Sequence, residues 1–209
     1  MKICSLVAKK GGVGKSAIAT NIAVCAAVDG YSVAIIDLDP QASACVWADV
    51  RDADLEVPTI PVTSIAPSRL HSALDICSSA GIGLTVIDTA PSADSGLLAA
   101  AKAGDICLLP SKPGLADLSA LSDTVELLKN SKAKGATILN MVATKALKLE
   151  GTKALEGLGF PVAPLSIWQR VAWGHAYSGG WGVIEYDSSG KAAHEMKQLW
   201  TWLKKQLEM

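Results

Sequence analysis

The sequence predicts one α/β domain spanning residues 1–209, built on a single doubly wound, mostly parallel sheet with helices on both faces. Short apolar runs rich in Val, Ile and Leu alternate with longer segments of helical pattern. Strands that are apolar along their whole length are typical of parallel sheets, because helices cover both faces of such sheets. No linker, repeat or low-complexity segment divides the chain, so a single domain is expected.

The expected elements alternate between strand and helix along the chain. The first apolar run, at 3–8, leads into a glycine-rich loop, and the helix behind it, at 16–28, ends before Gly30, a residue that suits helix ends. The runs at 32–37 and 84–88 are strands that each end in an aspartate, and 59–62 is a short strand beside prolines. Further strands are expected at 106–110, 137–142 and 162–165, and further helices at 41–50, 68–79, 93–103, 115–130, 150–158, 169–177 and 188–207.

Composition indicates a compact protein of a reducing compartment. Half of the residues are hydrophobic and 19% are charged, which argues against disorder. The apolar run at the start is too short for a signal peptide, and no stretch approaches the length of a membrane span, so we expect a cytoplasmic protein. The cysteines are widely spaced in apolar stretches, which predicts free thiols and no metal site or disulfide framework. They are Cys4, Cys25, Cys45, Cys77 and Cys107.

Charge is unevenly distributed along the chain. Residues 1–128 carry 8 Lys and Arg against 14 Asp and Glu, whereas residues 129–209 carry 11 against 6. A basic C-terminal part can attract nucleic acid or an acidic membrane surface. The alternative is that these lysines form ordinary solvated helix faces, and charge alone leaves both interpretations open.

The loop after the first strand has the pattern of a phosphate-binding loop. Glycines let backbone N–H groups surround phosphate oxygens, and the positive N-terminus of the next helix faces the same anion. By position, Lys15 should reach the β- and γ-phosphates of ATP, and the Ser16 hydroxyl should bind Mg²⁺. A glycine-rich turn without a ligand is the alternative, which the strand–loop–helix context disfavours. The loop reads Lys10-Gly11-Gly12-Val13-Gly14-Lys15-Ser16, with Lys9 where the standard motif has its first glycine.

This loop resembles the deviant Walker A signature, Lys-Gly-Gly-x-Gly-Lys-Ser/Thr, of the ParA/MinD family of ATPases. The resemblance spans nearly the whole chain and is diffuse outside the loops. It implies a P-loop NTPase fold, binding of ATP and ADP with Mg²⁺, and an ATP-bound homodimer in which Lys10 reaches the partner's phosphates. A cation supplied across a dimer would stabilise the transferring phosphoryl group, as an arginine finger does. Family members often have a second hydroxyl after Ser16; here Ala17 occupies this nucleotide-contact position, so one phosphate contact is missing.

Two aspartate loops follow other strands, so that the loops at 9–16, 37–43 and 88–92 converge on one edge of the sheet. The segment 37–41, Asp-Leu-Asp-Pro-Gln, resembles the family's Asp-x-Asp-Pro-Gln switch, which implies that Asp39 orients the attacking water and Asp37 lies near Mg²⁺. Alone, it would be a turn with an aspartate capping the next helix. Asp88 ends an apolar strand in the Walker B manner and should hold Mg²⁺ through water. The residues after it, Thr89-Ala90-Pro91, resemble the family's Asp-x-x-Pro switch.

Two later strands end in candidate adenine contacts. Asn140 ends one strand where family members place a side chain near the base, and Pro164 at the end of the next strand would border it. A purely structural role is an equal alternative for both residues.

The C-terminal part resembles that of short ParA proteins, in which basic residues bind DNA without sequence preference. Affinity of that kind falls steeply with salt, because the contacts are to phosphates. An ordinary solvated helix face is an equal alternative. The candidate DNA-binding residues are Arg170, Lys191, Lys197, Lys204 and Lys205.

The last helix carries an apolar stripe at helical spacing. Such a stripe usually faces the core, although a membrane-surface helix like that of MinD is the alternative, with Trp200 and Trp202 beside the stripe. The stripe consists of Ala192, Met196, Leu199, Leu203 and Leu207.

The resemblance implies a short, ParF-like partition ATPase, because the phosphate loop starts too early for a preceding helix-turn-helix domain. Lys10, Lys15 and Asp39 are the residues expected to act in hydrolysis, which would be weak alone and stimulated by a ParB-type centromere-binding partner. The protein would associate with the nucleoid and segregate plasmid or chromosomal DNA. The alternative is a MinD-like or cargo-positioning ATPase acting on a membrane surface or a protein organelle. A third hypothesis, a metallocluster carrier related to nitrogenase iron protein, lacks the paired cysteines it requires.

Overall fold

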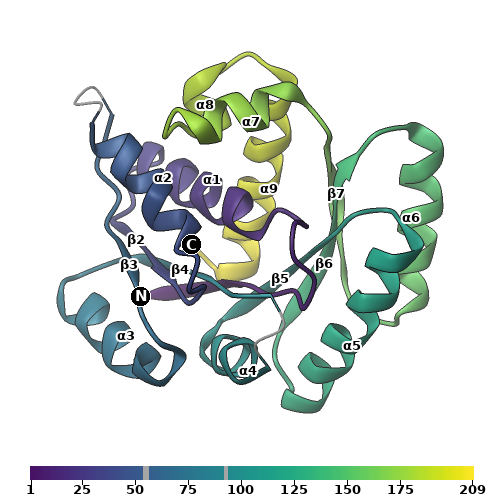
Figure 1. Ribbon diagram of the computed structural model, residues 1–209, viewed down its shortest axis with the longest axis horizontal. Coiled ribbons are helices and arrows are strands. Elements are labelled where there is room, and N and C mark those ends of the chain that lie inside the picture. The colour runs from purple at the N-terminus through teal and green to yellow at the C-terminus, as the bar shows by residue number, and fades with distance from the viewer. Residues whose placement is uncertain (54–56, 92–93) are drawn as a thin grey trace.

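A seven-stranded parallel sheet forms the centre of the molecule, with helices on both faces (Figure 1). The computed structural model describes residues 1–53, 57–91 and 94–209. The strand order is β3-β2-β4-β1-β5-β6-β7, which confirms the predicted doubly wound fold class. The strands are β1 (Lys2–Leu6), β2 (Val33–Asp37), β3 (Val62–Ser64), β4 (Leu84–Asp88), β5 (Ile106–Ser111), β6 (Gly135–Val142) and β7 (Val162–Trp168).

The helices divide between the two faces, and each group closes its own apolar core. One face is covered by α1 (Lys15–Val28), α2 (Ser43–Asp52), α7 (Val171–Ser178), α8 (Val183–Tyr186) and α9 (Lys191–Leu207). The other is covered by α3 (Leu70–Ser79), which follows a short 3₁₀ turn (Pro67–Arg69), and by α4 (Asp94–Ala103), α5 (Leu115–Ser131) and α6 (Lys145–Gly157).

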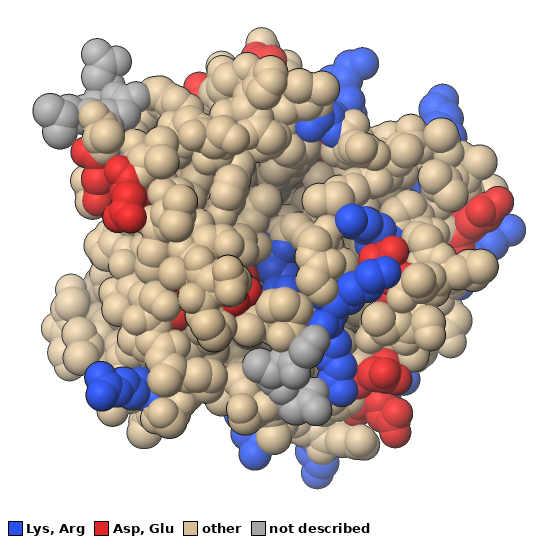
Figure 2. Space-filling model, viewed as in Figure 1, with Lys and Arg blue, Asp and Glu red and all other residues tan. Residues whose placement is uncertain are grey.

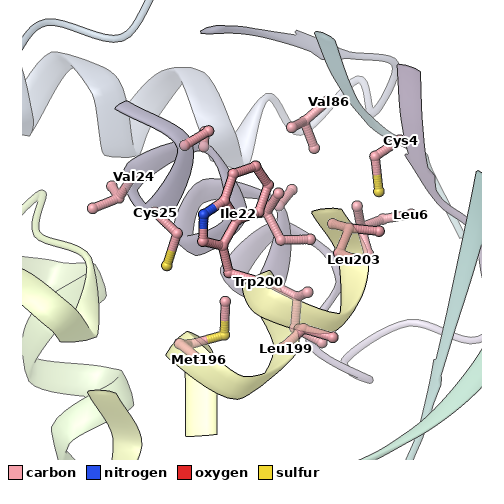
Figure 3. Packing of buried hydrophobic residues seen from close by; sticks show 14 of the residues in the cluster. Cys4, Leu6, Ile22, Val24, Cys25, Val86, Met196, Leu199, Trp200 and Leu203 are labelled. Carbon is pink, nitrogen blue, oxygen red and sulfur yellow. The ribbon is translucent and has the colours of Figure 1, made fainter. Parts of the chain in front are cut away.

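The stripe of α9 faces the core, as expected. Figure 3 shows Met196, Leu199 and Leu203 packed towards Ile22 of α1, with Trp200 lying among them. The stripe residues are at most 3% exposed, so they are not free to enter a membrane surface. None of the helices in the described ranges combines the length and apolarity that a membrane crossing demands.

Several element boundaries differ from the sequence predictions for identifiable reasons. β7 runs on to Trp168, three residues beyond its predicted end at 165, because it continues to pair with β6 through shifts in register. α6 begins at Lys145 instead of 150, since the Thr144 side chain caps it by accepting a hydrogen bond from the Leu147 N–H. α8 was not predicted. Residues 92 and 93, at which a candidate loop was expected to end and a helix to begin, lie outside the described residues.

The register of the central strands sets up the site. β2 and β4 pair in parallel so that Asp37 lies directly opposite Asp88 at their carboxyl ends. β1 lies on the other side of β4, with Leu6 opposite Asp88. The phosphate loop, which follows β1, therefore emerges at the same edge of the sheet as both aspartates, as the convergence of loops predicts.

Candidate functional site

Two glycines give the loop between β1 and α1 its shape. Gly12 and Gly14 have φ angles of 69° and 90°, in the left-handed region that side chains disfavour. Gly14 is the N-cap of α1, and its carbonyl accepts a hydrogen bond from the Ile18 N–H. A Cβ on Gly14 would come within 2.3 Å of Nδ2 of Asn140. Both the backbone angle and the close approach of Asn140 therefore require glycine at this position.

Asn140, at the end of β6, ties this loop to the sheet. Its Nδ2 donates to the Val13 carbonyl at 2.8 Å, and its Oδ1 accepts from the N–H of Met141 at 2.9 Å. The side chain is buried, and Met141 adopts a left-handed φ of 55° beside it. The amide predicted to lie near a base is thus engaged largely with protein backbone, and its observed contacts fix the shape of the phosphate loop.

Lys15 is the buried cation of the site. Lys15 is 6% exposed. Burial lowers the pKa of its ammonium group, and the nearby carboxylates of Asp88 and Asp39 partly oppose this by raising the pKa. The structure therefore places Lys15 near Asp39 and Asp88, two of the three acidic residues that the sequence assigned to the site. Figure 2 shows a hollow near the middle of this face in which basic side chains lie close to acidic ones.

Asp88 is a buried acidic residue whose side-chain oxygens lack hydrogen-bond partners. Both of its oxygens are buried, and neither makes a hydrogen bond of normal geometry within the described chain. Burial raises the pKa of Asp88 to about 7; the nearby Ser16 hydroxyl and Lys15 lower this pKa, and Asp37 raises it. A buried ion without partners is strongly unfavourable. Carboxylate and hydroxyl oxygens are the ligands that Mg²⁺ prefers, so Asp88 and Ser16 fit a magnesium ion.

Asp37 is buried beside Asp88, but protein N–H groups hold both of its oxygens. Oδ1 accepts from the Asp39 N–H at 2.9 Å, and Oδ2 accepts from the Ala44 N–H at 3.0 Å in the first turn of α2. Burial raises the pKa of Asp37, and these hydrogen bonds oppose the rise. The capping role that the sequence left open is therefore present. The role near a metal stays a prediction.

Asp39 lies two residues further along the same loop and is half-exposed. Its Oδ1 accepts from the Gln41 N–H at 2.9 Å, which leaves Oδ2 without a hydrogen bond that the structure records. Its proximity to Lys15 places it near the phosphate loop. A role in orienting water is compatible with this placement and stays a prediction.

Lys10 makes a contact that the sequence did not reveal. Its ammonium nitrogen lies 3.0 Å from Oδ1 of Asp117, in the first turn of α5. The Lys10 side chain is 38% exposed and that of Asp117 is 13% exposed. The resemblance implies that Lys10 reaches the phosphates of a second subunit, but in this structure Lys10 is paired with a residue of its own chain.

A pocket of about 220 Å³ lies beside the phosphate loop, between the start of α1 and the segment joining β7 to α7. This volume is below the about 300–1,000 Å³ typical of whole-ligand pockets, so the pocket suits one part of a larger ligand. It is lined by Ala17, Ile18, Asn140, Met141, Trp168, Gln169, Arg170, Trp173 and Gly174.

Pro164 does not line this pocket, and the expectation that it ends its strand is corrected, because it lies within β7; a contact with a base stays a prediction. It lies instead in grooves on either side of β7, one shared with α9 and one with α6. The reason is that β7 continues to Trp168, so the residues beyond the carboxyl end of the strand are Gln169 and Arg170. The loop that follows the strand therefore begins further along the chain than predicted.

The five basic residues proposed for DNA do not form one free surface. Arg170 is paired with Glu195, and Lys204 is paired with Asp29. Lys197 donates to the Ser188 carbonyl at 2.8 Å. Lys191 and Lys205 are exposed. On the face shown in Figure 2, basic side chains are scattered and interspersed with acidic ones, so DNA binding by these residues stays a prediction.

The fold and the loop belong to a recognised class of nucleotide-binding proteins. Residues 4–178 match the model of the CobQ/CobB/MinD/ParA nucleotide binding domain, and the chain belongs to this family. The predicted family is thereby confirmed, whereas the ParF-like subgroup stays a prediction.

Individual relatives are similar over nearly their whole length. Two are named maintenance of carboxysome distribution protein A. The protein from Halothiobacillus neapolitanus is 28% identical over 206 residues, covering 91% of this chain and 90% of the relative. The protein from Gloeobacter kilaueensis is 31% identical over 198 residues, covering 93% and 88%.

Solved structures share the fold. The cell division ATPase MinD of Pyrococcus furiosus superposes with a TM-score of 0.83 at 17% identity, covering 98% of each chain. The nucleotide-free McdA of Cyanothece gives a TM-score of 0.70 at 17% identity, covering 95% of this chain and 98% of that one. At these identities the structures show the fold alone.

Proposed function

We propose that this chain is a Mg²⁺-dependent ATPase that works as an ATP-bound homodimer and distributes a protein cargo within the cell. The observation that carries the choice of cargo is the pair of relatives, matched over 88–90% of their length, that are named for carboxysome distribution. They support the second of the alternatives raised by the sequence, a cargo-positioning ATPase, over segregation of plasmid or chromosomal DNA. The cargo itself is a large protein assembly of unspecified kind.

The chemistry follows from the residues around the phosphate loop. The backbone N–H groups of the loop and the N-terminus of α1 bind the β- and γ-phosphates, and the buried Lys15 supplies a positive charge to them. Ser16 and Asp88 hold Mg²⁺, which neutralises charge on the phosphate oxygens when bound. Asp39 orients the attacking water. These roles rest on position and on the family resemblance.

Lys10 gives the proposed cycle its dependence on dimerisation. In the single chain it faces Asp117 and does not lie in the buried centre of the site. We expect it to leave Asp117 and reach the phosphates of a second subunit, where its charge stabilises the transition state of phosphoryl transfer. Hydrolysis would then be slow in the monomer and stimulated by a partner that acts on the dimer.

Two lysine variants test the proposal. Lys15→Ala should abolish ATP binding measured by calorimetry, because the charge inside the loop is lost. Lys10→Ala should bind ATP as the wild type does but lose ATP-dependent dimerisation, measured by light scattering, and hydrolysis. Lys153→Ala, an exposed residue of α6, is the matched control. Wild-type hydrolysis by the Lys10 variant, or no response of the wild type to Mg·ATP, would contradict the proposal.

The cargo requires a separate experiment in the source cell. A chromosomal Lys15→Ala change should cause a fluorescently labelled protein assembly to cluster or to be inherited unevenly, while plasmid retention stays normal. Loss of plasmids with normal distribution of protein assemblies would restore the DNA-segregation interpretation. Filter binding at low salt, with and without ATP, would then show whether Lys191 and Lys205 contact DNA.

A further inference from the structure

The pocket beside the phosphate loop contains a buried donor without a partner. Trp173 lies in the first turn of α7 and lines the pocket. Its indole Nε1 is buried and makes no hydrogen bond within the described part of the chain. An indole N–H can only donate, and a buried donor left unpaired is unfavourable by about 1–3 kcal/mol. Such a group in a native structure calls for a missing partner.

The other buried polar groups of this pocket are already engaged. Asn140 uses Oδ1 and one Nδ2–H on backbone groups, and the guanidinium of Arg170 is paired with Glu195. Gln169 is exposed, so its amide is within reach of water. Among the side chains that line the pocket, Trp173 therefore has a buried donor for which the described chain provides no acceptor.

The pocket has the shape and surroundings of a site for an aromatic ring. It is about 220 Å³ in volume, and its wall is largely apolar, with two indoles, Ile18 and Met141. It is next to the loop through Ala17 and Asn140, whose amide holds Val13 in place. A ligand with phosphates in the loop would place its base here.

We propose that Trp173 is a specificity-determining residue of the nucleotide site, and that its indole N–H donates a hydrogen bond to a ring nitrogen of the purine. This inference rests on the proposed ATPase function. Nε1 is shielded from water in the ligand-free chain, so the role requires the indole ring to turn towards the base as the base enters. The residue thereby selects a ligand with an acceptor nitrogen at that place and packs its ring against the same base.

Trp173→Phe tests this role, since phenylalanine keeps an aromatic ring and removes the donor. ATP affinity, measured by calorimetry, should fall about 2- to 10-fold, the value of one hydrogen bond. Affinity for inorganic tripolyphosphate should not change, because that ligand has no base. Trp202→Phe, in the groove between α9 and β7, is the matched control and should bind both ligands normally.

ATP analogues provide a second measurement that uses the wild-type protein. The analogues are 1-deaza-, 3-deaza- and 7-deaza-ATP, each of which lacks one ring nitrogen. One of them should bind the wild type more weakly than ATP does, by the same factor that Trp173→Phe loses for ATP. The Trp173→Phe variant should bind that analogue and ATP with equal affinity. Equal ATP affinity of Trp173→Phe and wild type, or the same loss for every analogue in both proteins, would overturn the inference while leaving the ATPase proposal intact. Failure of the wild type to bind either ATP or tripolyphosphate would instead overturn the ATPase proposal, and this inference with it.

Discussion

The Lys10–Asp117 ion pair predicts that Asp117 restrains dimerisation. Lys10 must leave Asp117, 3.0 Å away, before it can reach a second subunit. Asp117→Asn removes the negative charge and keeps the size of the side chain. We therefore expect the variant to dimerise at a lower protein concentration than the wild type when both are saturated with a non-hydrolysable ATP analogue.

The magnitude follows from the exposure of the pair. With 38% of Lys10 exposed, solvent screens the attraction, and pairs of this kind contribute about 0.2–1 kcal/mol. A free energy of about 1.4 kcal/mol changes an equilibrium constant tenfold, so losing the pair in one subunit should strengthen dimerisation by at most about fivefold. Two subunits release one pair each, so the dimer dissociation constant should fall by at most about 25-fold.

Sedimentation equilibrium in the presence of the analogue measures this constant directly. Asp123→Asn, an exposed aspartate on the same helix, carries the same change of charge and serves as control. Raising the salt concentration should reduce the difference between Asp117→Asn and the wild type, because screening weakens the pair. A dimer that is weaker than the wild type, or no tighter than that of the control, would refute the reasoning.

Two further predictions concern the buried part of the site. Because burial raises the pKa of Asp88 from 3.8 to about 7, the folded chain holds a proton between about pH 4 and 7 that the unfolded chain has lost, and stability should fall as pH rises through this window. Asp88→Asn should flatten that fall in thermal melts recorded without magnesium or nucleotide, and an unchanged slope would contradict the assignment. Gly14→Ala should abolish nucleotide binding and destabilise the protein by about 1–3 kcal/mol or more in urea titrations, because its Cβ would lie 2.3 Å from Nδ2 of Asn140. Gly30→Ala is the control, because Gly30 has a similar φ of +84° and an added Cβ there would have nothing within 4 Å. Equal destabilisation by the two variants would rule out the clash with Asn140 as the cause.

Much of the fold was accessible from the sequence, because its signals are local. Apolar runs and the glycines of the phosphate loop predict a parallel sheet with a site at the carboxyl ends of its strands. The presence of Asp37 and Asp88 at the same edge also follows, since both residues end strands of that sheet, whereas their position directly opposite each other depends on the pairing of β2 with β4, which the sequence did not predict.

The parts that were missed depend on partners distant in the sequence. The contact of Lys10 with Asp117 joins residues 107 positions apart, and no local pattern marks it. Pro164 was placed at the end of its strand because a strand with shifted register gives no clear signal of its end. The start of α6 could have been found, because Thr144 is a good capping residue.

The hydrogen bonds of Asn140 have a consequence for how parts of a nucleotide would act on one another. The same amide holds Val13 in the loop and the N–H of Met141 at the wall of the pocket. An occupant that orders one side of this bridge therefore lowers the entropic cost of ordering the other, and the effect is reciprocal. Adenosine and tripolyphosphate added together should each bind more tightly than either does alone, even though no covalent bond joins them.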